Sequence, residues 1–375
     1  MSELKTQSAI IVQGPGKAQV EHCLAIPSPD AFELLIRVHA VALNPSDWMA
    51  LDHFARPGAG AGYDFAGEIV EIGEKAKSRW AVGNRVAGFV HGCHAANYTI
   101  GAFREYLTAD SELVVRLPDH VSYEAASTLG MGISTSAQAL YQSLKLPMPS
   151  ANPTPVNQTI LIYGGASATG SIAIQLAKLS GLHVVTTCSE QNVSWMRSLG
   201  ADEIVDYKQP DAVQRVVECV QKNGLYTILD CIGKESTAEF CSKCFTPPQD
   251  EACQPEYVYA PLMPLSKEFP TATSLPSSVT VQNRWKFVYT CFGKRFTTLM
   301  DHPAINGTWQ PSVEDKAFMI DFYRRFETIL ASGKISFMPQ EVRLGGLQTI
   351  LSGVSDVRAG KVHGKKLVYP IMTLI

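Results

Sequence analysis

From residue 159 onward, short apolar runs alternate with segments whose apolar residues recur at helical spacing. The pattern predicts strands and helices in strict alternation: 159–163, 169–180, 183–188, 191–199, 203–205, 211–221 and 226–231. Such alternation is typical of a parallel sheet that helices cover on both faces. We therefore predict an α/β domain with a doubly wound parallel sheet in this part of the chain.

The first third of the chain has a different pattern. Residues 8–120 carry short alternating or apolar runs separated by Gly, Pro and Asp, which predicts a β-rich region. The remaining segments predict a helix, an extended proline-rich connector, an irregular working loop, a long helix and a final strand: 122–144, 146–155, 245–278, 313–332 and 366–370.

A loop of very small residues joins the first strand to the first helix of the alternating region. Gly164, Gly165 and Gly170 stand among small residues at 166–168, so strict G-x-G-x-x-G spacing is absent. A strand, a tight turn and a helix in succession present backbone N–H groups and a helix N-terminus to a pyrophosphate. We predict a dinucleotide site here. The alternative is a βαβ unit that binds nothing.

The end of the second strand, at Cys188, indicates which nicotinamide cofactor binds. A site selective for NAD places Asp or Glu there, to accept hydrogen bonds from the ribose hydroxyls. This chain has Ser189, which is short, neutral and a donor, so a 2′-phosphate meets no carboxylate. We predict NADPH. In the alternative, Glu190 turns back to the ribose and the site takes NADH.

Composition excludes several function classes. A formal net charge of −3 gives no electrostatic footprint for nucleic acid or for an anionic membrane. The first residues are polar and no run of about 18 apolar residues occurs, so we expect neither a signal peptide nor a membrane span. Nine scattered cysteines, an odd number, favour reduced thiols in the cytoplasm over a disulfide framework.

Several segments share a family likeness: 44–47, 62–73, 82–88, 101–106, 199–207 and 363–368. Together they resemble the medium-chain dehydrogenase/reductase superfamily, in order and along nearly the whole chain. The resemblance implies a GroES-like β-rich catalytic domain, residues 1–155 and 313–375. Inserted in it would be a Rossmann domain that binds NADPH, residues 156–312.

The residues that zinc-dependent members of this superfamily need are missing. Their first catalytic ligand, a Cys, is replaced by Asn-Pro at 44–45, and their Gly-His-Glu reads Gly-Tyr-Asp at 62–64. Their structural lobe needs four close cysteines, and only Cys93 lies in that stretch. One further group could hold a metal but has no obvious fourth ligand: Cys241, Cys244 and Cys253. We predict no metal, with free thiols at these positions.

A second set of segments carries a narrower likeness: 44–47, 132–135, 146–150, 163–165, 188–189 with 192, 206–207, 229–232 and 235–237. These resemble the trans-acting enoyl reductases of fungal polyketide synthases, of the lovastatin type. The likeness implies NADPH-dependent reduction of the α,β double bond of a carrier-bound enoyl thioester in secondary metabolism. The implied partners are a polyketide synthase, or a synthase–peptide synthetase hybrid, and its acyl carrier protein. The implied state is a cytoplasmic monomer.

Two alternatives stay open: a free-standing NADPH-dependent quinone or enone reductase, and a non-catalytic scaffold protein.

Carried over residue by residue, the narrower resemblance implies two sets of site residues. The cofactor would contact Ser46, Asp47, Trp48, Met49, Ala166, Ser167, Ala168, Thr169, Ser189, Glu190, Gln191, Asn192, Tyr207, Ala260, Pro261, His363 and Gly364. The acyl channel would be formed by Thr135, Ser136, Ala137, Gln138, Ala139, Leu140, Tyr141, Gln142, Val288, Tyr289, Thr290, Cys291 and Phe292.

The implied reaction leaves its proton donor unidentified. Charge develops on the thioester oxygen, and Thr135, at the start of a helix, could offer it a hydroxyl and a backbone N–H. In the alternative, Thr135 is an ordinary helix residue with no role in the reaction. Relatives can have a Lys where this chain has Met49, so that cationic contact is lost. His53 could donate the proton, although an exposed loop histidine is the simpler interpretation.

Four basic residues could form a surface that receives an acidic carrier protein, or could simply form a solvated face: Arg284, Lys286, Lys294 and Arg295.

Overall fold

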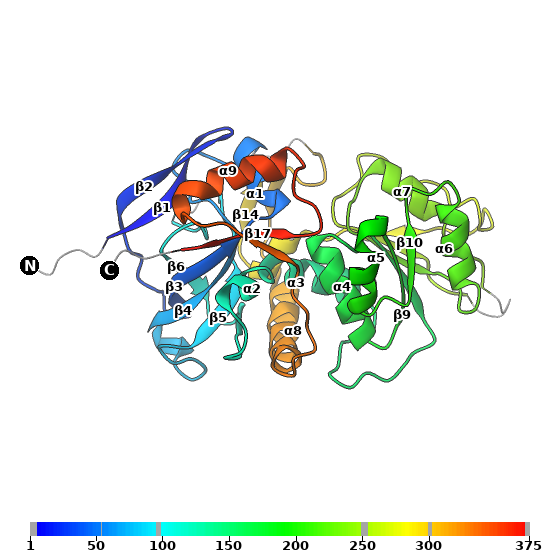
Figure 1. Cartoon of the computed structure of the whole chain (residues 1–375), viewed down its shortest axis with the longest axis horizontal. Coiled ribbons are helices and arrows are strands. Elements are labelled where there is room, and N and C mark those ends of the chain that lie inside the picture. The colour runs from blue at the N-terminus through cyan, green and yellow to red at the C-terminus, as the bar shows by residue number, and fades with distance from the viewer. Residues whose placement is uncertain (1–5, 54, 95–98, 249–253, 299–301, 372–375) are drawn as a thin grey trace, which may run out of the picture. The chain divides into compact units, whose positions relative to one another are not determined.

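The computed structural model describes residues 6–53, 55–94, 99–248, 254–298 and 302–371 (Figure 1). The chain divides into two compact units. We call them the β-rich unit, residues 1–131 and 289–375, and the Rossmann unit, residues 132–288. No helix among the described residues is both long enough and apolar enough to span a membrane.

Both unit boundaries lie earlier in the chain than the predicted 155/156 and 312/313. Residues just before the proline-rich connector pack into the Rossmann unit, where Tyr141 Oη lies 3.1 Å from Ser180 Oγ. Residues 289–296 pack into the β-rich unit, where the Tyr289 ring stacks on His91 with centroids 4.2 Å apart. Residues 132–155 therefore belong to the Rossmann unit, and residues 289–312 to the β-rich unit.

The β-rich unit contains a seven-stranded sheet and two antiparallel strand pairs among the described residues. The sheet runs in the order β16 (Gln340–Val342), β17 (Lys366–Pro370), β3 (Glu33–Ala42), β4 (Asp64–Ile72), β5 (Arg85–Phe89) and β7 (Val114–Arg116), with β6 (Tyr106–Asp110) paired to β3. The pairs are β1 (Thr6–Gly14) with β2 (Lys17–Ala25), and β14 (Phe296–Thr298) with β15 (Gly307–Trp309).

Strand β3 holds this sheet together because it pairs with β4, β6 and β17. The last strand, β17, returns from the end of the chain and runs antiparallel to β3, with Tyr369 opposite Val41. The helical segments of this unit are α1 (Pro45–His53), η1 (Glu74–Ala76), α2 (Tyr123–Ser127), η4 (Val288–Phe292) at its boundary, α8 (Val313–Ala331) and α9 (Leu347–Arg358).

The Rossmann unit is built on a six-stranded parallel sheet. Its order is β10 (Glu203–Asp206), β9 (His183–Cys188), β8 (Thr159–Tyr163), β11 (Thr227–Asp230), β12 (Val258–Pro261) and β13 (Gln282–Asn283). The strand order reverses beside β8, so ligands are expected outside the carboxyl ends of β8 and β11. The helical segments are α4 (Ala168–Leu179), η3 (Glu190–Asn192), α5 (Val193–Ser198), α6 (Ala212–Val220) and α7 (Glu235–Ser242).

Two predicted elements were wrong. The helix expected over 122–144 is broken into α2, α3 (Gly130–Ala137) and a π-helical segment, η2 (Gln138–Ser143). Ser122 caps α2 by accepting a hydrogen bond from Ala125 N at 3.1 Å. The irregular stretch expected over 245–278 contains β12, whose four residues are all buried. Three predicted strands begin and end at the expected residues: 159–163, 183–188 and 366–370.

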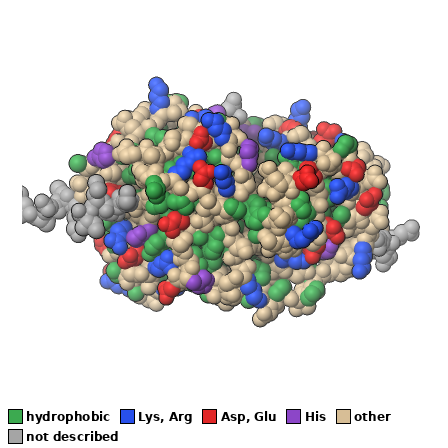
Figure 2. Space-filling model, in the orientation of Figure 1, with side chains coloured by type: hydrophobic (Ala, Val, Ile, Leu, Met, Phe, Trp, Pro, Cys, Tyr) green, Lys and Arg blue, Asp and Glu red, His purple; other side chains and the backbone are tan. Residues whose placement is uncertain are grey.

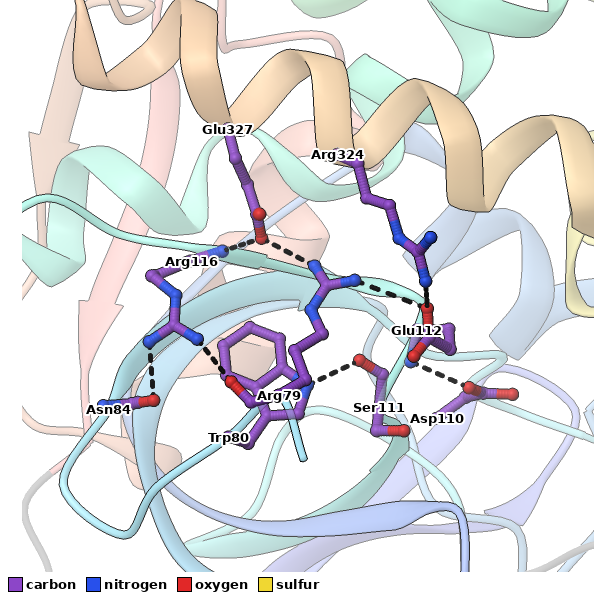
Figure 3. Close-up of polar contacts among 9 residues, drawn as sticks. All are labelled: Arg79, Trp80, Asn84, Asp110, Ser111, Glu112, Arg116, Arg324 and Glu327. Atoms are coloured by element: carbon purple, nitrogen blue, oxygen red, sulfur yellow. Dashed lines mark hydrogen bonds and ion pairs between the residues drawn. The ribbon is translucent and has the colours of Figure 1, made fainter. Parts of the chain in front are cut away.

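A polar network ties helix α8 to the loops of the seven-stranded sheet (Figure 3). Arg79 donates to Glu327 at 2.9 Å and lies 3.4 Å from Glu112. The guanidinium groups of Arg79 and Arg116 both stack on the Trp80 ring, 4.8 and 4.4 Å from its centroid. We call this set the α8 network: Arg79, Glu112, Arg116, Arg324 and Glu327.

Candidate active site

The loop between β8 and α4 can approach a ligand closely because its residues are small. Gly164 has a φ of +80°, a conformation that side chains other than glycine rarely adopt. A Cβ on Gly165 would lie 2.2 Å from Thr186 Oγ1, so only glycine lets the loop pack on β9. Ser167 caps α4, since its Oγ accepts from Gly170 N at 3.0 Å.

The first turn of α4 offers N–H donors that no helical carbonyl accepts. The predicted pyrophosphate residues 166–169 lie together here and are all partly exposed. Backbone donors at the positive end of a 12-residue helix match the chemistry of a diphosphate. The residues present therefore fit the diphosphate of a nicotinamide dinucleotide.

Asp230, the last residue of β11, shapes the turn beside this loop, and the sequence analysis did not single it out. Its side chain is fully buried. Oδ1 accepts from Ile232 N at 2.9 Å and Gly233 N at 3.0 Å. Oδ2 accepts from Tyr259 Oη at 2.7 Å and Thr237 Oγ1 at 2.5 Å. Its position at the end of a strand beside the switch point is the sequence feature that could have identified Asp230.

The predicted 2′-phosphate residues gather after β9 and β10, two neighbouring strands. Asn192 Nδ2 donates to Ser189 Oγ at 3.1 Å, and both side chains are partly exposed. Tyr207, just after β10, is 41% exposed, so its ring is available to a ligand. Glu190 and Gln191 are exposed. The structure thus brings these five residues to one edge of the sheet.

A carboxylate that the sequence analysis did not weigh stands at the same edge. Asp206 lies opposite Cys188 in the β9–β10 register. Burial, with a smaller contribution from Asp206, raises the pKa of Cys188 to about 11. Asp206 Oδ1 accepts from Lys208 N at 3.0 Å and Oδ2 from Gln209 Nε2 at 3.4 Å. Asp206 therefore holds the turn after β10.

The residues predicted at the nicotinamide ribose fall in both units. In the Rossmann unit, Ala260 and Pro261 are buried at the end of β12, where Pro261 lies opposite Asp230. In the β-rich unit, His363 is exposed in the turn before β17. Gly364 in that turn has a φ of +64°.

Helix α1 carries the residues predicted at the nicotinamide end. Ser46, Trp48 and Met49 are partly exposed, whereas Asp47 is only 1% exposed. Asp47 Oδ2 accepts from Asn44 N at 2.6 Å, the reach-back contact of a helix cap. Asp47 Oδ1 has no hydrogen-bond partner among the described residues. Burial raises the pKa of Asp47 well above its ordinary value, although the Asn44 N–H opposes the shift.

The positions at which zinc-dependent relatives place ligands have a different donor set here. Asp64 is fully buried and its Oδ2 accepts from Lys366 Nζ at 2.5 Å. Asp64 Oδ1 accepts from Met131 N at 2.7 Å, and Lys366 Nζ also donates to Thr128 O at 3.2 Å. Tyr63 beside them is fully buried. A carboxylate already paired with an ammonium group does not fit a zinc site.

The cysteine group offers no metal site within the part of the chain that the structure describes. Cys241 and Cys244 are buried and free. Cys253, the third member of the predicted group, lies outside the described residues. Within the described ranges, no three His, Cys, Asp or Glu side chains gather in a way that could hold a metal.

Thr135 lies on α3, but not where the sequence analysis expected it. The helix begins at Gly130, so Thr135 is the sixth residue. Only the first four N–H groups of a helix lack an intrahelical acceptor. The expectation of a free backbone N–H at Thr135 was therefore wrong. Its side chain is partly exposed, so the hydroxyl is the group that it offers.

Most of the predicted acyl-channel residues are buried in their own unit. Leu140 is fully buried, and Tyr141 Oη packs against α4 at 3.4 Å from Leu176 O. Ser136 Oγ donates to Thr169 O at 3.1 Å. Four further members in the Rossmann unit are also buried: Ala137, Gln138, Ala139 and Val288. Gln142 is partly exposed.

The rest of that set belongs to the β-rich unit. Tyr289, Thr290 and Cys291 are buried. Phe292 is partly exposed and lines a small cavity of about 60 Å³ together with His91 and Phe296. This cavity lies wholly within the β-rich unit.

The basic side chains expected to form one face are divided between the units. In the Rossmann unit, the Arg284 guanidinium is bonded to Glu256 and donates to Ser143 O at 3.2 Å. In the β-rich unit, Lys294 and Arg295 are exposed, and Lys294 Nζ lies 3.7 Å from Glu33 Oε1. Figure 2 shows basic and acidic side chains interspersed over the face that it draws. His53 is an exposed residue at the end of α1.

Comparisons with known proteins decide the family. Residues 30–119 match the alcohol dehydrogenase GroES-like domain, and residues 168–248 match the zinc-binding dehydrogenase domain. The trans-enoyl reductase caaB of Aspergillus niger is 34% identical over 97% of this chain and 97% of its own. The trans-enoyl reductase traG of Penicillium crustosum is 31% identical over 98% of each chain. The chain belongs to the trans-enoyl reductase family.

Solved structures agree with this trans-enoyl reductase membership at the level of the fold. The CurK enoyl reductase superposes with a TM-score of 0.73 over 98% of this chain and 100% of its own, at 19% identity. An alcohol dehydrogenase superfamily protein from Novosphingobium aromaticivorans gives a TM-score of 0.76, also at 19% identity. The predicted medium-chain dehydrogenase/reductase fold is confirmed, and membership of the trans-enoyl reductase family implies a nicotinamide cofactor.

Proposed function

We propose that this chain uses NADPH to reduce the α,β double bond of an enoyl thioester that an acyl carrier protein presents. The carrier would belong to a polyketide synthase, or a synthase–peptide synthetase hybrid, of fungal secondary metabolism. The observation that carries the proposal is full-length identity of 31–34% to three fungal trans-enoyl reductases. The glycine loop at the switch point of the Rossmann sheet supports it.

The residues of this chain would bind the cofactor and stabilise the charge that develops on the substrate. When bound, the reduced nicotinamide supplies the hydride. The α4 N-terminus and residues 164–170 would hold the diphosphate. As the β-carbon of the substrate gains the hydride, negative charge moves to the thioester oxygen, and the Thr135 hydroxyl is the proposed donor to it. A proton then reaches the α-carbon and completes the reduction.

A turnover assay tests the proposal directly. The purified chain is given NADPH with a medium-length enoyl thioester, and in parallel with a quinone. We expect oxidation of NADPH with the thioester and little with the quinone. Thr135→Val should lower kcat about tenfold or more, with the Kd for NADPH unchanged, and Thr135→Ser should restore most of the rate. Turnover of the quinone alone would support the free-standing reductase, and no turnover would support the scaffold.

The preference for NADPH is supported by the groups at the carboxyl end of β9. Ser189 and Asn192 offer donors there, and Glu190 is exposed. Ser189→Glu would place a carboxylate where the 2′-phosphate is proposed to bind. It should weaken NADPH and strengthen NADH, so that the ratio of the two dissociation constants reverses. An unchanged ratio would contradict the assignment.

The partner proposal is supported by exposed cations of the β-rich unit. Lys294 and Arg295 are neighbours in sequence and both exposed. Carrier proteins are usually acidic, so charge reversal of both residues should slow reduction of carrier-bound substrate and spare a free thioester analogue. Equal loss on both substrates would argue against docking.

The remaining proposals concern the setting in which the enzyme works. We propose a monomer, supported by a sheet edge, β13, that is only two residues long. We also propose a cytoplasmic enzyme, supported by cysteines that are all free among the described residues. Light scattering of the purified chain would show a dimer if the first proposal is wrong, and cell fractionation tests the second.

A further inference from the structure

Arg104 is a buried cation of the β-rich unit that the proposed reaction does not use. It forms an isolated bridge with Ala9 just before β6, and the residue is only 4% exposed. Its guanidinium lies against the backbone of Gly60, because a Cβ on Gly60 would fall 2.3 Å from the terminal nitrogen. The side chain is therefore built into the unit.

This guanidinium lacks a counter-charge among the described residues. Arg104 has no ion pair there, and its buried Nε has no hydrogen-bond partner. Burial lowers the pKa of Arg104 to about 10, and no neighbouring carboxylate offsets the effect. Lys366 is equally buried, at 3% exposure, yet it has Asp64 at 2.5 Å. A buried charge is normally paired, so the contrast points to a missing anion.

Arg104 lines a cavity of about 510 Å³, within the range of small-molecule sites. None of its lining residues belongs to the predicted cofactor or acyl sets. We call it the Arg104 cavity, and it is lined by Gln7, Ile11, Gln13, Glu21, Leu24, Ala25, Pro27, Gly58, Thr99 and Arg104.

Four residues that line the Arg104 cavity are apolar: Ile11, Leu24, Ala25 and Pro27. Two amides of the lining are already engaged with protein groups. Gln7 Oε1 accepts from Tyr106 N at 2.9 Å, and Gln13 Nε2 donates to Glu21 Oε1 at 2.7 Å. Among the described lining residues, Arg104 is the cationic side chain that a ligand could contact.

We propose that the Arg104 cavity binds a small molecule with an aliphatic body and one carboxylate group. A guanidinium matches a carboxylate with two parallel hydrogen bonds, and the apolar lining residues would contact the aliphatic body. Glu21 on the same lining disfavours a more highly charged anion such as phosphate. The site goes beyond the proposed reduction and does not depend on it.

Calorimetric titration of the full chain with octanoate, octanamide and inorganic phosphate tests the charge requirement without any variant. We expect saturable binding of octanoate, at least about tenfold weaker binding of octanamide, and none of phosphate. The proposal is overturned if octanoate does not bind, if octanamide binds equally well, or if phosphate binds more tightly than octanoate.

A second experiment assigns the site to Arg104. Arg104→Met keeps the length of the side chain and removes its charge, and it should weaken octanoate at least about tenfold. Arg104→Lys should give an intermediate affinity. Arg215→Met, at an exposed residue of the Rossmann unit, is the matched control and should bind as the parent does. Octanoate affinity that survives in Arg104→Met would place the ligand elsewhere and overturn the assignment.

Two further readouts separate a ligand site from a structural role. Removal of an unpaired buried charge should leave the melting temperature of Arg104→Met, without octanoate, equal to or above that of the parent. Octanoate should raise the melting temperature of the parent and not that of Arg104→Met. If Arg104→Met is strongly destabilised or fails to fold, Arg104 is a structural residue and the proposal is wrong. NADPH turnover should be unchanged in this variant.

Discussion

Asp47 and Asp64 are both buried carboxyl groups, but their partners differ. Asp64 accepts from Lys366 Nζ at 2.5 Å, so its charge is compensated. Asp47 accepts one backbone hydrogen bond and has an unpartnered Oδ1 among the described residues. Burial raises the pKa of Asp47 well above its ordinary value. The sequence analysis placed Asp47 among the cofactor residues, but predicted neither helix α1 nor the burial of Asp47.

The raised pKa of Asp47 should make stability depend on pH. Between the ordinary pKa of an Asp, about 4, and the raised pKa in the folded chain, the folded state holds a proton that the unfolded state has lost. The free energy of unfolding is therefore highest, as far as Asp47 affects it, at low pH. It falls as the pH rises, by at most about 1.4 kcal/mol per pH unit. Asp47→Asn never ionises and keeps an acceptor for Asn44 N.

Urea denaturation from about pH 5 to about pH 8 measures this effect. We expect the free energy of unfolding of Asp47→Asn, relative to the parent, to rise as the pH rises. Parallel pH profiles for the two proteins would show that Asp47 is ionised in the folded state, against this expectation.

Lys366→Met should be strongly destabilising because it leaves the Asp64 carboxylate buried without its partner. Loss of one member of a buried pair costs about 3–5 kcal/mol. Lys361→Met is the control, since Lys361 pairs with Asp356 on the surface, with 70% of its side chain exposed, and should cost under about 1 kcal/mol.

The double variant Asp64→Asn with Lys366→Met completes this test. It removes both charges, so it should recover part of the stability that Lys366→Met loses. Chemical denaturation of the four proteins at one pH gives the comparison. Equal losses in Lys366→Met and Lys361→Met would contradict a compensated buried pair.

Elements with a strong local pattern were predictable, and elements set by packing were not. The strands 159–163 and 183–188 are almost wholly buried, so their continuous apolar runs marked them. Strand β12 lies in a proline-rich stretch and is a strand because it pairs with β11. The sequence analysis did not predict the π-helical segment η2, whose residue Tyr141 contacts α4, far away in the sequence.

The α8 network gives a test of how a long helix is fixed to a sheet. Glu327 Oε1 accepts from Arg79 at 2.9 Å and from Arg116 N at 2.8 Å (Figure 3). Glu327→Ala should lower the free energy of unfolding by about 1–2 kcal/mol, because both donors lose a charged acceptor. Thermal and urea denaturation measure the loss.

Asp321→Ala is the matched control on the same helix. Asp321 accepts from Arg325 at 2.8 Å in an exposed pair one turn apart, so its loss should cost under about 0.5 kcal/mol. If the two variants lose the same stability, the α8 network does not stabilise the attachment of the helix.

The whole chain was predictable as a fold because its motifs are local and follow one another in a fixed order. The glycine loop was predicted, and the helix expected over 169–180 is α4, Ala168–Leu179, since small residues between a strand and a helix need no partner to be recognised. The unit boundaries were not, because the contacts that place residues 132–155 and 289–312, such as those of Tyr141 and Tyr289, join segments far apart in the sequence. Arg104 went unnoticed in the sequence because a missing counter-charge is visible only in three dimensions.

Treatment with a metal chelator should leave the activity and the thermal stability of the enzyme unchanged. The positions that hold zinc in related enzymes carry Asn44, Tyr63 and an Asp64 that is paired with Lys366. Dialysis against a chelator should therefore change neither the NADPH-dependent turnover nor the melting temperature. Activity that falls on dialysis and returns with added zinc would contradict this expectation.

The position of β17 has a consequence for synthesis on the ribosome. This strand, near the end of the chain, lies between β16 and β3, and β3 begins at residue 33. During translation the Rossmann unit is complete once residue 288 has emerged, whereas the seven-stranded sheet must wait for residue 370. Nascent chains should therefore pass through a stage in which the middle of the polypeptide is folded and its first third is still exposed to chaperones and proteases.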